Sequence, residues 1–179
     1  TLPEHFQEQA RESIKSVYSL DFLDINKPIT EKALEKTMIE NIKRLMLELG
    51  YGFCFIGNQY RLSLGEKEYY IDLLFYHRRL KCLIAIDLKI GEFEAAHKGQ
   101  MELYLRYLEK HEQVEGENTP IGLILCTGKN EEHVELMQLH KSNIHVADYL
   151  TLLPSQKVLK QKLHQAIEIA KNRIDIEKG

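Results

Sequence analysis

Two aspartates and a lysine stand inside apolar, strand-like stretches, where charged side chains are rarely placed. Asp72 interrupts "YYIDLLFYH", and Asp87 and Lys89 interrupt "KCLIAIDLKI". An unpaired ion inside a protein costs several kcal/mol, so such charges need a partner or a task. A pair of carboxylates can bind a divalent cation, provided that the fold brings the two together.

The apolar pattern predicts how the two stretches pair. Side chains alternate between the faces of a strand, so Asp87 and Lys89 point to the same side. A hairpin whose turn centres between Arg79 and Leu80 buries one complete apolar face. In that register Leu73 faces Ile86, Phe75 faces Ile84 and Ile71 faces Leu88.

The same register sets Asp72 directly opposite Asp87, with Cβ atoms about 4.5–5.5 Å apart. Like charges at that separation destabilise a sheet, and a divalent cation between them removes this cost. Mg²⁺ is commonly held by one or two carboxylates together with water and substrate phosphates. The alternative is a salt-bridge cluster of the two acids with Lys89, which accounts for the lysine but not for the second acid.

Two predicted helices carry further polar residues. In the helix over residues 31–49, Glu35 projects within the core-facing arc, either as a third carboxylate of the site or bent outward to water. In the helix over residues 92–111, Gln100 lies within the face predicted to be buried. The other members of that face are Ala96, Leu103, Tyr104 and Tyr107. A buried amide requires partners, so Gln100 bonds to the backbone or reaches the carboxylates.

The order of the predicted elements indicates the fold class. Thr30 caps the helix over residues 31–49, and Gly50 ends it. Strands are predicted at 52–56, up to 64, and at 69–77, 81–90, 121–127 and 143–147; further helices are predicted at 92–111, 131–139 and from a cap at Ser155 to 173. This order is typical of an α/β or α+β fold with a mixed central sheet flanked by helices.

We expect residues 1–30 to form a lead-in segment and residues 31–179 to form one domain. Within the lead-in, a short amphipathic helix is predicted from Phe6, Ala10, Ile14 and Val17. Because the chain starts without an initiator methionine, we expect it to be a piece of a longer protein. In the last helix, Val158, Leu159, Leu163, Ile167 and Ile169 form an apolar face that suits either a core or an interface.

The composition describes a globular protein. The chain has 179 residues, 44% hydrophobic and 28% charged. No apolar stretch approaches the roughly 18–20 residues of a membrane helix. The net charge of −3 argues against coating nucleic acid through bulk positive charge, although a local basic groove stays open. Cys54, Cys82 and Cys126 lie in apolar runs without metal-ligand spacing, which favours buried reduced thiols in a cytoplasmic protein.

Basic residues near the predicted site are candidate nucleic-acid contacts, although each also suits a solvated surface. They are Arg78, Arg79 and Lys81 in the hairpin turn, His97 and Lys98 near the start of the following helix, and Arg61 with Asn58 in "NQYR". The sequence has no HExxH zinc motif, no Gly-rich phosphate loop and no GxSxG motif. This disfavours zinc hydrolysis, nucleotide binding and acyl transfer.

The spacing of Asp72 from Asp87-Leu88-Lys89 across a strand hairpin resembles the signature of the PD-(D/E)XK nuclease superfamily. Longer stretches, "LELGYGFCFIGNQYRL", "IDLLFYHRRLKCLIAIDLKIGEFEAAHKGQMELYL" and "IGLILC", are similar to the YhcG-type nuclease family, over roughly residues 20–155. Ile71 stands where the superfamily pattern has proline, and Asp87 is the acid of the D/E-x-K triplet. Neither choice removes a metal ligand. Members of the family typically carry an additional N-terminal domain.

The resemblance implies a restriction-endonuclease-like core and a metal-dependent DNA endonuclease of recombination, repair or DNA defence, with a homodimer as an open alternative. It also implies the site residues. Asp72, Asp87 and the Leu88 main-chain carbonyl would be ligands of Mg²⁺ or Mn²⁺, and Glu35 would be the acid that completes or supports the metal site. Lys89 would activate water and stabilise the phosphate, and Gln100 would position Lys89 or contact the DNA backbone. The rival hypothesis is a module on the same fold that binds nucleic acid or protein without cleavage.

Overall fold

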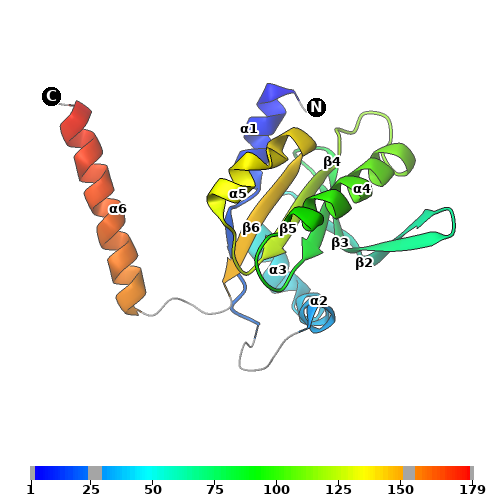
Figure 1. Ribbon diagram of the computed structural model, residues 1–179, viewed down its shortest axis with the longest axis horizontal. Coiled ribbons are helices and arrows are strands. Elements are labelled where there is room, and N and C mark those ends of the chain that lie inside the picture. The colour runs from blue at the N-terminus through cyan, green and yellow to red at the C-terminus, as the bar shows by residue number, and fades with distance from the viewer. Residues whose placement is uncertain (1–2, 24–29, 151–155, 178–179) are drawn as a thin grey trace.

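A six-stranded mixed sheet forms the centre of the protein (Figure 1). The computed structural model describes residues 3–23, 30–150 and 156–177. The strands are β1 (Val17–Ser19), β2 (Phe53–Leu64), β3 (Lys67–His77), β4 (Cys82–Leu88), β5 (Ile121–Cys126) and β6 (Ile144–Leu150), in the order β1-β6-β5-β4-β3-β2. The β2–β3 and β3–β4 pairs are antiparallel, and the others are parallel. The predicted α/β fold with a mixed sheet is confirmed.

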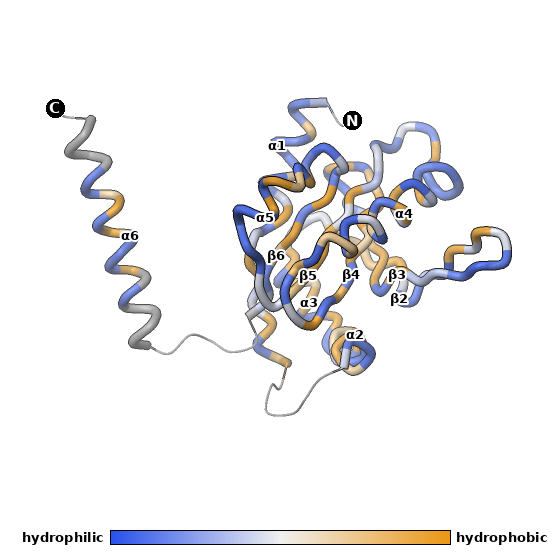
Figure 2. The backbone as a smooth tube through the Cα atoms, in the orientation of Figure 1, coloured by the Kyte–Doolittle hydropathy of each residue, from blue (hydrophilic) through white to orange (hydrophobic). Residues whose placement is uncertain are grey.

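Helices cover both faces of this sheet. One apolar core lies between the sheet and the helices α1 (Glu4–Ser13), α2 (Glu31–Glu40) and α3 (Ile42–Leu49). The second core lies between the opposite face and α4 (Ala95–His111), α5 (Glu131–Leu136) and a 3₁₀ turn, Leu139–Ser142. Figure 2 shows apolar stretches concentrated in the central strands. Because both faces are covered, β4 and β5 are buried along their whole length.

The predicted register of the β3–β4 hairpin is confirmed: Leu73 pairs with Ile86, and Phe75 pairs with Ile84. Ile71 differs from the prediction, because it belongs to the core on the α4 side rather than to that of Leu73 and Phe75. The change of face coincides with a left-handed backbone in the neighbouring strand. Gln59, with φ of 47°, lies between the pairs that β2 makes with Leu73 and Ile71.

The predicted helix over residues 31–49 is two helices, α2 and α3, separated at Asn41. Thr30 caps α2 as predicted, with its hydroxyl oxygen accepting from the Ala33 N–H at 3.1 Å. Asn41 has φ of −112°, and its side-chain amide donates to the Thr37 carbonyl at 2.9 Å. Asparagine side chains compete with the helical backbone in this way, so the chain changes direction there.

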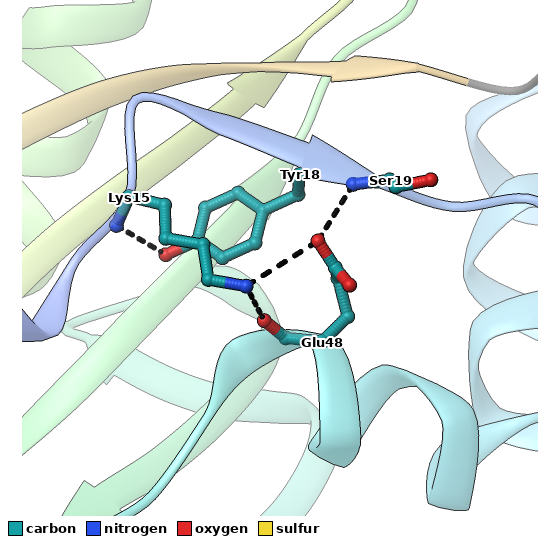
Figure 3. Close-up of polar contacts among 4 residues, drawn as sticks. All are labelled: Lys15, Tyr18, Ser19 and Glu48. Atoms are coloured by element: carbon teal, nitrogen blue, oxygen red, sulfur yellow. Dashed lines mark hydrogen bonds and ion pairs between the residues drawn. The ribbon is translucent and has the colours of Figure 1, made fainter. Parts of the chain in front are cut away.

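The N-terminal segment contributes both a helix and a strand to the fold. The predicted amphipathic helix is α1, but Val17 lies in β1, which pairs with β6. Figure 3 shows how this segment is attached to α3. The Glu48 carboxylate accepts from the Ser19 N–H at 2.8 Å, and the Lys15 ammonium donates to the Glu48 carbonyl at 2.6 Å. Tyr18, 1% exposed, lies in the core between the sheet and α1–α3.

The chain ends in α6, Gln156–Glu177 (Figure 1). On its apolar face Leu163, Ile167 and Ile169 are exposed. Val158, Leu159 and the predicted cap at Ser155 lie outside the described side chains. None of the helices in the described parts of the chain is both long and apolar enough to cross a membrane.

The cysteines are not all buried as expected. Cys82 and Cys126 are buried in the central strands, whereas Cys54 is exposed. The difference follows from its position on β2, which is the edge strand of the sheet.

Candidate active site

Asp72 of β3 and Asp87 of β4 lie beside each other at one end of the hairpin. Asp87 is 3% exposed, and its Oδ2 accepts no hydrogen bond but lies 3.2 Å from the Lys89 Nζ. Asp72 is half-buried, and its Oδ2 accepts from the Leu88 N–H at 2.8 Å. The arrangement therefore brings two carboxylates and one ammonium together where β4 ends.

The environment raises the pKa of Asp72 to about 7. Burial is the largest cause, followed by the hydrogen bond to Asp87 and the negative charge of Asp87. The Leu88 N–H and the Lys89 charge oppose the rise in pKa. At pH 7 the carboxylate pair therefore carries this proton in about half of the molecules. A divalent cation placed between the carboxylates would replace that proton, so this donor set fits Mg²⁺ or Mn²⁺.

Lys89 is held by its main chain as well as by its side chain. Its N–H donates to the Leu125 carbonyl at 2.8 Å, and its carbonyl accepts from the Tyr149 hydroxyl at 3.2 Å. The ammonium donates to the Gln100 side-chain oxygen at 3.3 Å, and the side chain is 14% exposed. The predicted contact of Gln100 with the site is thus present. Sequence reasoning missed Tyr149, because nothing local links it to Lys89.

Helix α4 supplies Gln100 from the edge of its buried face. That face differs from the prediction: it consists of Met101, Tyr104, Leu105 and Leu108, while Ala96 is exposed. Residues 92–94 lie outside the helix, which starts at Ala95 after a capping box between Glu94 and His97. Tyr104 lies close enough to the site that, after burial, the charges of Asp87 and Asp72 raise its pKa.

Glu35 points inward, as one of the two readings of the sequence predicted, and is 8% exposed. Its carboxylate is not grouped with the carboxylate pair in the structure. Across the described parts of the chain, no three His, Cys, Asp or Glu side chains are grouped closely enough to hold a metal ion. Instead the Glu35 carboxylate accepts from the Asn58 amide at 3.0 Å and from the Gln59 amide. The Gln59 amide also donates to Asp72 Oδ1 at 3.3 Å.

From the sequence, "NQYR", which contains Asn58 and Gln59, is predicted only as a candidate nucleic-acid contact, and neither residue is assigned a role at the carboxylates. The available signal was two adjacent amides inside a predicted strand. The two side chains also line an open cavity of about 1190 Å³ between α2 and the β2–β3 hairpin, which reaches Asp72.

The predicted basic contacts fall into two groups. Arg78, Arg79 and Lys81 lie at the β3–β4 turn, and the expectation that they lie near the site is wrong. The carboxylates occupy the other end of the same antiparallel strands, about 20 Å away at 3.3 Å per residue. Arg61 is ion-paired with Glu68 on the β2–β3 hairpin.

Lys98 lies in the first turns of α4, two residues before Gln100. Its ammonium is 3.4 Å from the Glu102 carboxylate, and its side chain is 27% exposed. His97 is close enough to Lys89 that the lysine charge, after burial, lowers the pKa of the imidazole. These two are therefore the basic candidates closest in sequence to Gln100, and His97 also lies close to Lys89 in space.

Paired carboxylates with a lysine at the end of a mixed sheet form the arrangement expected of the PD-(D/E)XK class of nucleases. A family model described as the YhcG PDDEXK nuclease domain matches residues 11–164, and the chain belongs to this family. The chain is 38% identical over 155 residues to a protein of Escherichia coli K12 named "Putative nuclease YhcG". That match covers 86% of the chain but 41% of the relative, so the chain spans less than half of the relative's length.

Among solved structures, a repair endonuclease from Pyrococcus abyssi superposes with a TM-score of 0.46 and 16% identity, over 73% of this chain and 50% of that one. A complex of EndoMS with double-stranded DNA superposes with a TM-score of 0.49 and 14% identity, over 74% and 50% of the two chains.

Proposed function

We propose that the protein is a metal-dependent endonuclease that hydrolyses DNA phosphodiester bonds at the cluster of Asp72, Asp87 and Lys89. The observation that supports the proposal is the contact of two carboxylates with each other and with one ammonium, in a chain of a nuclease family. A module that only binds nucleic acid or protein has no need of two acids held together at a cost in stability.

Asp72, Asp87 and the Leu88 carbonyl would hold Mg²⁺ or Mn²⁺. A divalent ion held there supplies Lewis acidity toward phosphate oxygens and acidifies water. The protein provides the position: Asp72 is oriented by the Leu88 N–H, and Asp87 is fixed within a buried strand.

Lys89 would stabilise the charge that develops on the phosphate. An ammonium has three N–H donors. The Lys89 Nζ donates to Gln100 at 3.3 Å and lies 3.2 Å from Asp87 Oδ2 without a hydrogen bond to it, so donors remain for a phosphate oxygen or the attacking water. Gln100 thus acts as a positioning residue, because its hydrogen bond keeps the Lys89 ammonium from turning fully toward Asp87.

The DNA would approach the end of β4 and the start of α4. Lys98 and His97 lie on this side and are the basic side chains that we propose as phosphate contacts. Arg61 is available on the β2–β3 hairpin if its pair with Glu68 opens. With a net charge of −3, binding depends on this local group rather than on the whole surface. A cytoplasmic location, a role in recombination, repair or DNA defence, and a homodimer stay predictions.

The test is Lys89→Ala, assayed for cleavage of duplex and branched DNA with Mg²⁺ and for DNA binding by anisotropy. We expect cleavage to fall about 10²–10³-fold while binding is retained, as for the loss of one charge-stabilising donor. Lys110→Ala, an exposed lysine in the last turn of α4, is the matched control. If the wild type binds DNA but cuts none, the binding module is correct; if Lys89→Ala cuts at the wild-type rate, the assigned site is wrong.

A further inference from the structure

Gln59 has an unusual backbone conformation for a residue within a strand. The non-glycine residues of the described chain with positive φ are Gln59, Lys81, Gln138 and Asn143. Lys81 lies in the turn before β4, and Gln138 and Asn143 flank the 3₁₀ turn. Left-handed backbone is common in turns but unfavourable for a side chain-bearing residue inside a strand, so it persists where the surroundings require it.

The side chain of Gln59 gives a reason for this conformation. Its amide nitrogen donates to both the Glu35 carboxylate and the Asp72 Oδ1. A primary amide has two N–H donors, so it can serve both acceptors at once. Since the Asp72 Oδ2 accepts from the Leu88 N–H, both oxygens of this carboxylate are oriented by donors from neighbouring strands. Gln59 therefore fixes the rotation of Asp72.

Glu35 in turn fixes Gln59. Its carboxylate is buried against the hairpin, and it accepts the Asn58 amide with one oxygen and the Gln59 amide with the other. A buried carboxylate that accepts two amides is a firm anchor, since hydrogen bonds to a charged group are stronger than neutral ones. The contact also joins α2 to the β2–β3 hairpin at the level of the site.

We propose that Gln59 is a positioning residue of the nuclease site: anchored by Glu35, its amide orients the Asp72 carboxylate for the metal ion. Glu35 then acts on the site through Gln59 and is not itself a metal ligand. This inference rests on the proposed function, because it assumes that the carboxylate pair binds a metal.

The primary measurement is Mn²⁺ binding to the 179-residue chain by calorimetry, without DNA or turnover. Gln59→Gly removes the amide while tolerating the φ of 47°. We expect its affinity for Mn²⁺ to be about 10–100-fold weaker, as for other residues that orient a metal ligand. Gln138→Gly is the matched control, because exposed Gln138 has φ of 49° away from the site. It should bind as the wild type does, and an unchanged affinity in Gln59→Gly would overturn the proposal.

A double variant separates a positioning role of Glu35 from a ligand role. If Glu35 acts through Gln59, Glu35→Ala weakens Mn²⁺ binding about as much as Gln59→Gly, and the double variant is no weaker than either single variant. A further loss of about tenfold or more in the double variant would identify Glu35 as a ligand and overturn this part of the proposal.

Metal-free protein provides a readout that does not depend on the nuclease proposal. The side-chain amide signal of Gln59 in a ¹⁵N spectrum should shift in Glu35→Ala, while that of Gln138 should not. If the Gln59 signal does not move, the anchoring contact is absent and the inference fails. If it moves but the wild type neither binds Mn²⁺ nor cleaves DNA, the proposed function fails although the contact exists.

Discussion

The two carboxylates of the site are held in different ways, although they lie side by side. Asp72 is half-buried and accepts from Gln59 and from the Leu88 main chain. Asp87 is almost fully buried, and its Oδ2 has the Lys89 ammonium nearby without a hydrogen bond. A carboxylate oxygen in this state is stabilised by a neighbouring cation, because burial has removed its hydration. Asp87 should therefore contribute more than Asp72 to the affinity for a metal ion.

Replacing Asp87 with asparagine tests this dependence. Asp87→Asn keeps the volume of the side chain but removes its charge, so we expect Mn²⁺ affinity to fall by about 100-fold or more. The fold should be retained, since the substitution also removes a like charge beside Asp72. Calorimetry and far-UV circular dichroism measure the two effects, with exposed Asp21→Asn as the control. Unchanged Mn²⁺ binding in Asp87→Asn would remove this residue from the metal site.

The β3–β4 hairpin shows what could be predicted about the elements. Its register followed from the sequence because β4 is buried along its whole length and few alignments bury every apolar residue of the hairpin. That register alone predicted that Asp72 lies beside Asp87, whereas the contact of Gln100 with Lys89 was implied by the family resemblance and not by the helical pattern.

Other features had weaker local signals. The break at Asn41 and the left-handed Gln59 depend on side chain–backbone and side chain–side chain hydrogen bonds, which an apolar pattern does not encode. Strand β1 is three residues long, and its partner β6 lies more than a hundred residues away, so no local periodicity marks it. Arg78 was wrongly expected near the site. It lies in the turn of the β3–β4 hairpin, and the carboxylates lie at the opposite end of the two strands.

The start of β2 depends on a glycine that packs under a buried histidine. A Cβ atom added to Gly52 would lie 2.5 Å from the His77 ring, and Gly52 has φ of 102°. Gly50 has a similar φ of 98°, with no atom within 4 Å of an added Cβ. The two positions therefore differ in steric clash but not in backbone strain.

We expect Gly52→Ala to lower the free energy of unfolding by about 2–4 kcal/mol, and Gly50→Ala by about 1 kcal/mol. Urea denaturation of both variants measures the difference. Equal losses would mean that the His77 ring moves aside without cost, and the packing of β2 against His77 would then not limit stability.

The stability of the whole protein should depend on pH through His145. Burial, and secondarily the charge of Arg11 in α1, lower the pKa of His145 from 6.5 to about 4. Below about pH 6.5 the unfolded chain takes up a proton that the folded protein does not. The free energy of unfolding therefore falls as the pH decreases toward about 4, and then this contribution levels off.

His145→Gln should remove this contribution, so the wild type loses more stability than the variant between pH 6.5 and 4. The comparison must be made between variants, because the raised pKa of Asp72 gives a slope of opposite sign below about pH 7. Urea denaturation across this range gives the two curves. His164→Gln, at a side chain that is 78% exposed, is the control. Parallel curves for wild type and His145→Gln would show that His145 is protonated equally in both states.

The N-terminal segment and the C-terminal helix should contribute very differently to the folded state. Tyr18 and Leu20, with exposures of 1% and 0%, lie in the core beneath α1 and β1, and Glu48 ties this segment to α3 (Figure 3). Each large buried side chain contributes about 1.5–3 kcal/mol, and a domain is stable by only about 5–15 kcal/mol. In contrast, the apolar side chains of Leu163 and Ile167 in α6 are exposed.

We therefore expect a chain that lacks residues 1–20 to be unfolded or aggregated. A chain that ends at residue 155 should keep the urea midpoint of the 179-residue protein. Circular dichroism during urea titration compares the three chains. A folded protein without residues 1–20 would show that the sheet is stable without β1 and α1. A lower midpoint after removal of α6 would show instead that its apolar face is covered in solution, and analytical ultracentrifugation would then establish whether a second copy covers it.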